Sequence, residues 1–241
     1  MGRFRPARLA PLLALLASIA FGQAARSDLD AQRLRTGVFR YRTIVDGKEA
    51  GESRIEIRKS ESGNLVFTNR VEGAFSQTWE AVASRAFEPV SAKLTMGEGK
   101  DARTIFELEY RSGRVTGFAM SGGAAEAERR PVNDPIAADT VDQRIDWAAV
   151  MARSDYAPGG EFTFHVYDPA TGHSRVAARV LGFETAAVPA GSFETARIEY
   201  RIEKNRGTET YIVLVSEAVP RMLVKEIFPN GAVTELVEAK P

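Results

Sequence analysis

Apolar and polar residues alternate with a period of two over most of the chain. Phe39, Tyr41 and Thr43 alternate with Arg40 and Arg42. The apolar members of four further alternating segments are Ile55 and Ile57; Phe106, Leu108 and Tyr110; Phe162, Phe164 and Val166; and Ile198, Tyr200 and Ile202. This spacing is typical of antiparallel strands with one apolar face and one solvated face. The pattern therefore predicts a mainly β fold.

Turn sequences separate these segments at intervals of about 10 to 15 residues. Asp46-Gly47 and Ser112-Gly113 have the composition of two-residue hairpin turns. Longer turns are expected at Ser62-Gly63-Asn64, Asn205-Arg206-Gly207 and Pro229-Asn230-Gly231. We expect about 10 to 12 strands in one antiparallel sheet.

One segment, Asp139 to Arg153, departs from the alternating pattern. Its apolar stripe has helical spacing and consists of Val141, Ile145, Ala148, Ala149 and Ala152. Asp139 suits the N-cap of a helix, and Asp142 would lie in its first turn. Pro158-Gly159-Gly160 would end any helix before the next strand. The segment therefore predicts a helix over 139–153.

The stretch from Ser121 to Pro135 is rich in Gly, Ala, Glu and Arg and indicates a long flexible connection. It divides a single β domain, residues 25–241, into two halves at about 36–120 and 136–238. A sheet of this size with one apolar face can close into a barrel, or curl and cover its concave face with a helix. The single central helix favours the second form, a half-barrel or incomplete barrel.

The first 24 residues have the layout of a secretory signal peptide. Arg3, Arg5 and Arg8 precede an apolar run of about 13 residues, and Gly22-Gln23-Ala24 places small residues before Ala25. We expect cleavage between Ala24 and Ala25 and a soluble protein in the periplasm. The alternative is a retained membrane anchor, for which the apolar run is short.

The charge balance argues against nucleic-acid binding. The chain has 32 Lys and Arg against 32 Asp and Glu, with both signs interspersed, and lacks the concentrated basic face that phosphates require. It contains no Cys, which excludes disulfides and thiolate chemistry. Its two histidines, His165 and His173, lack zinc-ligand spacing, and His165 should face solvent.

Nothing in the sequence specifies a reaction. No Gly-x-Ser-x-Gly elbow is present, and the carboxylates lie on strand faces beside Arg and Lys. A carboxylate pair assembled from distant segments remains an alternative. We predict no enzymatic activity, no cofactor and no metal site.

The aromatic residues are numerous enough to line an apolar cavity between the sheet and the helix. The residues expected at such a cavity are Trp79, Phe106, Ile145, Trp147 and Phe164. The alternative is that they fill an ordinary core. An incompletely closed sheet tends to leave a cleft where a ligand can lie.

Two motifs in the last third of the chain resemble a family of exported bacterial proteins known as domain of unknown function 3108. They are Val188-Pro189-Ala190-Gly191-Ser192-Phe193-Glu194-Thr195 and Val219-Pro220-Arg221-Met222-Leu223-Val224-Lys225. The opening segment, with Val45-Asp46-Gly47-Lys48, is similar as well. The resemblance implies a curved half-barrel with a helical lid, similar in shape to periplasmic lipoprotein and lipid carriers.

The expected function is therefore an exported, non-enzymatic envelope protein that binds or carries an apolar or lipid-like ligand. The alternative is an interaction or scaffold module that docks an envelope protein through an exposed sheet edge or its convex face.

Overall fold

The computed structural model describes residues 28–73, 76–121, 128–154, 156–204 and 207–241. Within these ranges, fifteen strands form one sheet. They are β1 (Gly37–Val45), β2 (Lys48–Lys59), β3 (Leu65–Gly73), β4 (Gln77–Ala83), β5 (Pro89–Met96), β6 (Arg103–Arg111), β7 (Arg114–Ser121), β8 (Glu128–Pro135), β9 (Thr140–Asp142), β10 (Glu161–Asp168), β11 (Gly172–Val188), β12 (Gly191–Lys204), β13 (Gly207–Ser216), β14 (Leu223–Ile227) and β15 (Val233–Lys240). The helical segments are α1 (Asp146–Met151) and the 3-10 turns η2 (Ala31–Arg33), η3 (Gly99–Asp101) and η4 (Gln143–Ile145).

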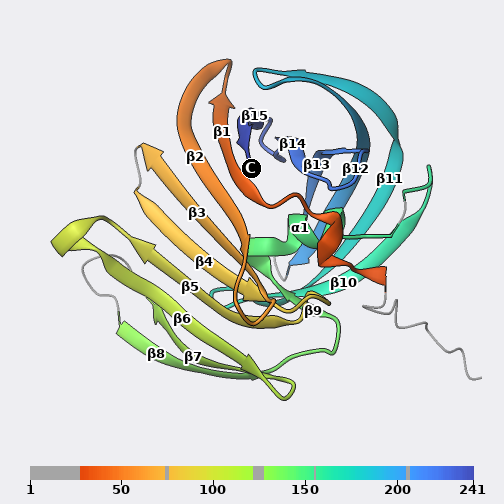
Figure 1. The fold of residues 1–241 in the computed structure, drawn as a ribbon. Coiled ribbons are helices and arrows are strands. Elements are labelled where there is room, and N and C mark those ends of the chain that lie inside the picture. Colours follow the sequence, from red (N-terminus) through yellow and green to blue (C-terminus); the bar gives the residue numbers. More distant parts are fainter. Residues whose placement is uncertain (1–27, 74–75, 122–127, 155, 205–206) are drawn as a thin grey trace, which may run out of the picture.

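The two halves of the chain are joined through the first and last strands. The order across the sheet is β8-β7-β6-β5-β4-β3-β2-β1-β15-β14-β13-β12-β11-β10-β9, so β1 pairs with β15 in the middle. All neighbours are antiparallel except β9 and β10, which are parallel. The sheet curls around α1, which lies on its concave side (Figure 1). The predicted curved β fold, with a helix on the concave face, is confirmed.

The hairpin turns follow from local sequence. Asp46 and Gly47 both have positive φ, 50° and 75°, and connect the directly paired residues Val45 and Lys48. Ser112 and Gly113 repeat this arrangement, with φ of 50° and 73°. Two consecutive positive φ angles give the turn whose twist matches that of the flanking strands. The expected leader with its Ala24–Ala25 cleavage point, and residues 205–206 of another expected turn, lie outside the described residues.

The predicted number of strands, about 10 to 12, was too low. One missed strand is β8, which lies in the stretch assigned to a flexible connection and pairs with β7 along its length. Pro131, Pro135 and a single buried residue, Val132, leave no apolar alternation in it. Residues 122–127 of that stretch lie outside the described residues.

The predicted helix over 139–153 was too long. Thr140, Val141 and Asp142 form β9, and the α-helix begins only at Asp146. Asp142 instead caps η4, because its carboxylate accepts a hydrogen bond from the Arg144 amide. Asp139 is not an N-cap, since its carboxylate lies 2.7 Å from Nδ1 of His165.

The apolar stripe of this segment is nevertheless buried. Its five residues, Val141, Ile145, Ala148, Ala149 and Ala152, are each at most 1% exposed. The small alanine side chains let α1 lie close to the apolar face of the sheet. Among the residues described, no helix combines the length and apolarity needed to cross a bilayer.

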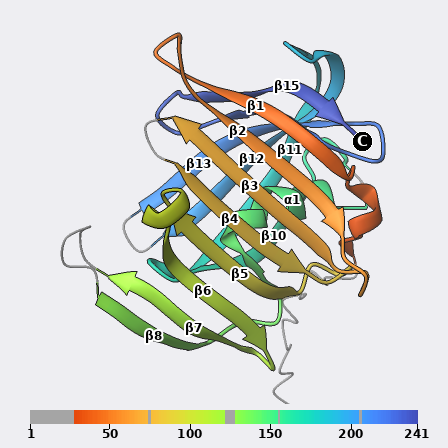
Figure 2. The same cartoon turned by 60° about the vertical axis from the view of Figure 1, so that its left-hand side comes forward.

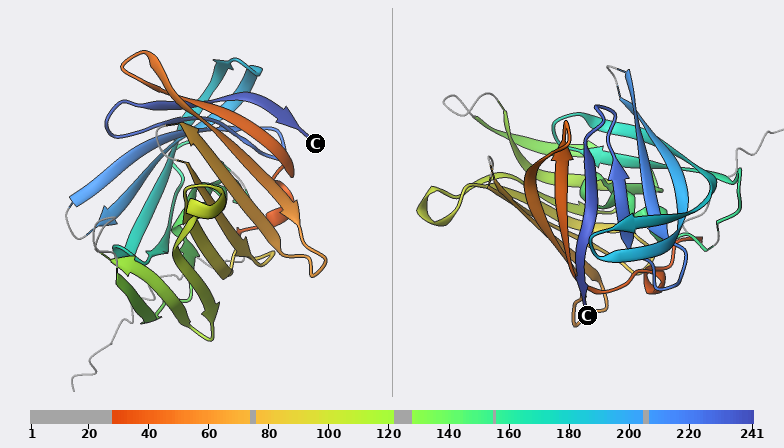
Figure 3. Two further views of the ribbon diagram at one scale, coloured as in Figure 1. Left: turned by 90° about the vertical axis from the view of Figure 1, so that its left-hand side faces the viewer. Right: turned by 90° about the horizontal axis from the view of Figure 1, so that it is seen from above.

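The two ends of the sheet, β8 and β9, are not hydrogen-bonded to each other as strands. Figures 2 and 3 show the course of the strands toward these two ends. Side-chain hydrogen bonds connect β8 to β10 and to the start of β11. The Tyr167 hydroxyl donates to Asp134 of β8 at 2.6 Å, and Arg130 of β8 donates to the carbonyl of Pro169. His173 also contacts the Pro135 carbonyl, at 2.6 Å. The sheet is therefore an incomplete barrel that side-chain contacts hold together.

Ile145 provides a test of this packing. Ile145 is the last residue of η4, and its side chain is fully buried. We therefore expect Ile145→Ala to lower the free energy of unfolding by about 2–5 kcal/mol. The control Val45→Ala, at a residue 39% exposed, should change it by less than about 0.5 kcal/mol. Urea unfolding followed by circular dichroism measures both. An equally small effect in both variants would contradict the assigned packing.

Candidate functional site

A cleft lies between η4, the start of α1 and the strands β4 to β6. Its wall on the sheet is an apolar row, because register places Trp79 opposite Leu94 and Leu94 opposite Phe106. Trp147 of α1 faces this row. The cleft has a volume of about 330 Å³, and its lining is completed by Gln77, Gln143, Arg144 and Asp168.

Trp147 is held in place at both ends of its ring. The indole Nε1 donates a hydrogen bond to the Arg144 carbonyl at 2.9 Å. The ring meets the fully buried Phe67 of β3 edge to face, with centroids 6.2 Å apart and planes at 87°. An edge-to-face contact of this kind is favourable beyond the apolar area it buries. Trp147 itself is only partly buried, so one side of its ring is left to the cleft.

Arg144 forms the polar side of the cleft, and its charge is fully compensated. Its guanidinium makes a two-point contact with Asp142, at 2.5 and 2.6 Å, and a third contact with Asp168 at 2.6 Å. The same group lies 4.5 Å above the ring of Phe106. Asp142 also accepts a hydrogen bond from the Tyr110 hydroxyl at 2.5 Å. The geometry is the bidentate arrangement that makes arginine–carboxylate pairs specific.

The titration of these groups reflects their burial. Burial alone would lower the pKa of the Arg144 guanidinium, but the adjacent Asp142 carboxylate raises it above its usual value. Burial, and then the charge of Asp142, raise the pKa of the Tyr110 hydroxyl well above its ordinary value. Arg144 therefore stays cationic and Tyr110 neutral. With two carboxylates against one guanidinium, this group carries a net charge of −1.

The cleft contains three of the five aromatic and aliphatic residues expected at a cavity, namely Trp79, Phe106 and Trp147. Ile145 is fully buried, and neither it nor Phe164 lines the cleft. Phe164 is 6% exposed on β10, where its ring stacks on Phe162 at 6.5 Å. Sequence reasoning missed Leu94 and Arg144; the Asp-x-Arg spacing of 142 and 144 was the available signal for the second.

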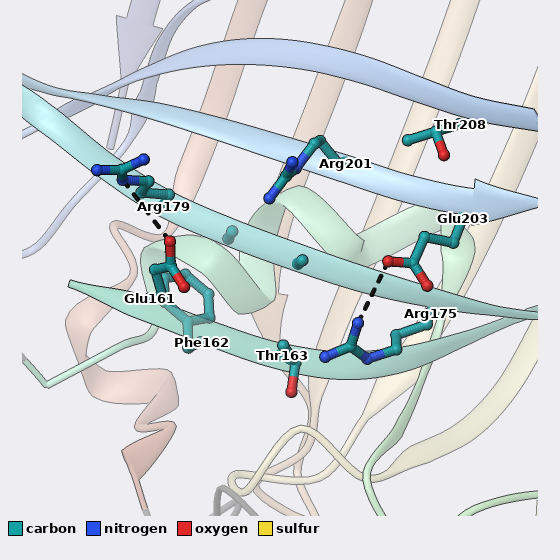
Figure 4. Close-up of a pocket in the computed structure, with 10 residues that line it drawn as sticks. Glu161, Phe162, Thr163, Arg175, Arg179, Arg201, Glu203 and Thr208 are labelled. Atoms are coloured by element: carbon teal, nitrogen blue, oxygen red, sulfur yellow. Dashed lines mark hydrogen bonds and ion pairs between the residues drawn. The ribbon is translucent and has the colours of Figure 1, made fainter. Parts of the chain in front are cut away.

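A second hollow lies on the outer face of β10 to β13 (Figure 4). It has a volume of about 270 Å³. The arginines at its edge are paired with carboxylates, Arg179 with Glu161 at 3.7 Å and Arg175 with Glu203 at 3.2 Å. Exposed cross-strand pairs of this kind are typical of a solvated sheet face. The apolar cleft is therefore the stronger candidate for a site.

The described part of the chain contains no group of three His, Asp or Glu side chains arranged to hold a metal. His165 points outward, with 41% of its side chain exposed, and pairs with Asp139. His173 is exposed and packs against the Tyr167 ring at 5.2 Å. His165 is thus engaged by Asp139, and His173 by the Tyr167 ring and the Pro135 carbonyl.

Comparison with solved structures supports the fold. A β-barrel-like protein of domain of unknown function DUF1849 from Brucella abortus matches with a TM-score of 0.52 and 9% identity, over 87% of this chain and 99% of that one. A protein of Bacteroides fragilis described as exported, with a YmcC-like fold, matches with a TM-score of 0.40 and 13% identity over 89% of this chain and 100% of that one. At these identities the first match indicates a shared fold alone, and the second score carries no argument.

No curated protein shows significant similarity to the chain. Residues 38–237 match the sequence model of one family, which is described as "Protein of unknown function (DUF3108)". The match begins at the second residue of β1, covers β2 to β14 in full and most of β15, and confirms the resemblance seen in the sequence. The chain therefore belongs to the DUF3108 family.

Proposed function

We propose that this protein is an exported, non-enzymatic protein of the cell envelope that binds or carries an apolar ligand in the cleft between α1 and β4 to β6. The observation that carries the proposal is the row Trp79–Leu94–Phe106 facing Trp147 across a space of about 330 Å³. This volume is at the lower end of the range of about 300–1,000 Å³ that ligand pockets occupy. It suits a ring system or part of an acyl chain.

The charges at the cleft favour an uncharged ligand. An anionic headgroup would need a cation, but Arg144 is already engaged by Asp142 and Asp168. The remaining net charge of −1 would repel a carboxylate or phosphate. Gln77 and Gln143 offer amide groups that can bond to a hydroxyl or carbonyl of a neutral ligand. We therefore expect selection for neutral over anionic amphiphiles.

The same contacts support binding rather than catalysis. The charged groups of the cleft are fixed in one ion-pair network, and its other polar groups are two glutamines. A reaction would need a nucleophile or a general base that is free to take a proton.

The exposed strand edges give little support to the alternative of a docking module. The free edge of β8 carries Pro131 and Pro135, which lack amide donors, and the charges of Glu128, Arg129 and Arg130. Such residues are a known means of preventing strand addition. At the other end, all three residues of β9 are buried.

The role of Trp147 can be tested by truncation. We expect Trp147→Ala to cost about 1–2 kcal/mol of stability, less than the 3–5 of a fully packed ring, because one side of the ring already borders the cleft. Binding of the neutral probe N-phenyl-1-naphthylamine should fall at least several-fold. Urea unfolding and probe fluorescence measure the two effects. Absence of probe binding by the wild-type protein would contradict the proposal.

Asp168→Asn tests the charge selectivity. Losing one carboxylate leaves Arg144 with Asp142 alone, so affinity for a dansyl-labelled fatty acid should rise by about three- to tenfold. The asparagine oxygen can still accept the Ala170 amide that Asp168 accepts at 2.8 Å. Affinity for the neutral probe should be unchanged, which makes it the internal control. A parallel rise for both probes would show that charge does not set the selectivity.

Export can be tested in the native host. The leader predicts cleavage between Ala24 and Ala25 and release of the rest of the chain into the periplasm. Intact mass of the protein from a periplasmic extract should correspond to residues 25–241. A full-length mass recovered with the membrane would show that the leader is retained as an anchor.

A further inference from the structure

A cluster of polar side chains lies where α1 faces β12 to β14. Asp146, the first residue of α1, is 4% exposed, and its carboxylate accepts a hydrogen bond from the Trp147 amide at 2.7 Å. Glu226 of β14 is paired with Val213 of β13, which is fully buried, so both lie on the interior face of the sheet. The Tyr200 hydroxyl of β12 bonds to Glu226 and interacts with Asp146. Two carboxyl groups from separate elements thus lie near enough to interact on the concave side of the sheet, with Asp146 buried and Glu226 partly buried.

The neighbouring charges do not neutralise this pair. The other titratable groups that face it are Tyr41 of β1, Asp142 of β9, Arg144 of η4, Lys204 of β12 and Tyr211 of β13. Lys204 is paired with Glu209 at 2.6 Å, and Glu209 also accepts the Tyr211 hydroxyl at 2.7 Å. Arg144 is paired with Asp142 and Asp168. Each nearby cation therefore already has its own carboxylate.

Both carboxyl groups hold their protons to unusually high pH. Burial raises the pKa of Asp146 to about 7 despite the Trp147 amide and Arg144, which lower it. Burial, and then the charge of Asp146, raise the pKa of Glu226 to about 8. The unfolded chain loses these protons near its ordinary values of 3.8 and 4.5. The contribution of the protonated pair to the free energy of unfolding is therefore fully present below about pH 4, and it is lost as the pH rises to about 8.

We propose that Asp146 and Glu226 form a pH-sensitive latch, which holds α1 against β12 to β14 while both are neutral and loosens it when they ionise. Ionisation places two negative charges near each other, one of them on the buried Asp146, and these charges repel each other. Asp146 adjoins Trp147, so loosening of α1 withdraws the indole from the cleft. The effect on ligand affinity rests on the proposed function; the movement of α1 does not.

The first experiment needs no ligand. The chain has two Trp residues, and both line the cleft, so intrinsic fluorescence reports on the cleft directly. Between pH 5.5 and 9 we expect a fluorescence transition centred at about pH 7–8, with a fall in the urea midpoint over the same range. The variants Asp146→Asn and Glu226→Gln mimic the neutral acids and should fold. Each should reduce both changes, and the double variant should abolish them.

Glu199→Gln is the matched control. Glu199 lies on β12 next to Tyr200 but on the other face, with 30% of its side chain exposed and an ion pair to Arg201 at 3.7 Å. The Glu199→Gln variant should show the same pH-dependent fluorescence transition and urea midpoint as the wild-type protein. A wild-type protein without a transition in this range, or a double variant with an unchanged transition, would overturn the latch.

The second experiment adds N-phenyl-1-naphthylamine. Its dissociation constant should rise about tenfold between pH 6 and pH 9 in the wild type, and less than about twofold in the double variant. Tight binding with no pH dependence in the wild type would refute the latch and leave the proposed function standing. Absence of binding at every pH, together with the ligand-free transitions, would refute the proposed function and leave the latch standing.

Discussion

The buried carboxylate of Asp142 is the contact on which the arrangement of the interior depends. It is fully buried at the end of β9, where it caps η4. It also accepts hydrogen bonds from the Arg144 guanidinium and from the Tyr110 hydroxyl of β6. Through Arg144 it is also connected to Asp168 of β10. A carboxylate in this position is stable only because so many donors reach it. One side chain thus fixes where the chain leaves the sheet and enters α1.

The consequence is that α1, although only six residues long, has a defined orientation. Its first residue, Asp146, faces the wall formed by β12 to β14, and the next, Trp147, faces Phe67 and the cleft. Adjacent residues on a helix point in directions about 100° apart. A polar cluster and an apolar cleft therefore lie on different sides of the same short helix, and a change at one is transmitted to the other over a single residue.

Alternation along the chain was sufficient to predict strands whose two faces differ. Trp79 and Phe106 were expected at a cavity because the chain is rich in aromatic residues, and both line the cleft. The pattern is absent from β8, which is exposed except at Val132, and from β9, which is buried throughout. A strand that is wholly buried or wholly exposed has no period of two to detect.

The remaining parts of the site depend on contacts between distant segments. Leu94 belongs to the cleft because register places it between Trp79 and Phe106. Arg144 was not predicted, because its partner Asp168 is 24 residues away in sequence. Such pairings follow from tertiary packing, which local pattern does not specify.

The way the sheet ends meet also bears on how a ligand could enter. A closed barrel would bring β8 and β9 together through a ladder of backbone hydrogen bonds, which must break together if the ends are to separate. Here individual side chains bridge the ends, among them Tyr167 to Asp134 and His173 to the Pro135 carbonyl. Separate side-chain bonds contribute only about 1 kcal/mol each, so they can exchange with water one at a time. Asp168, which lines the cleft, immediately follows Tyr167. The hydrogen bond from Tyr167 to Asp134 therefore lies one residue from the lining of the cleft and outside the fifteen-stranded ladder.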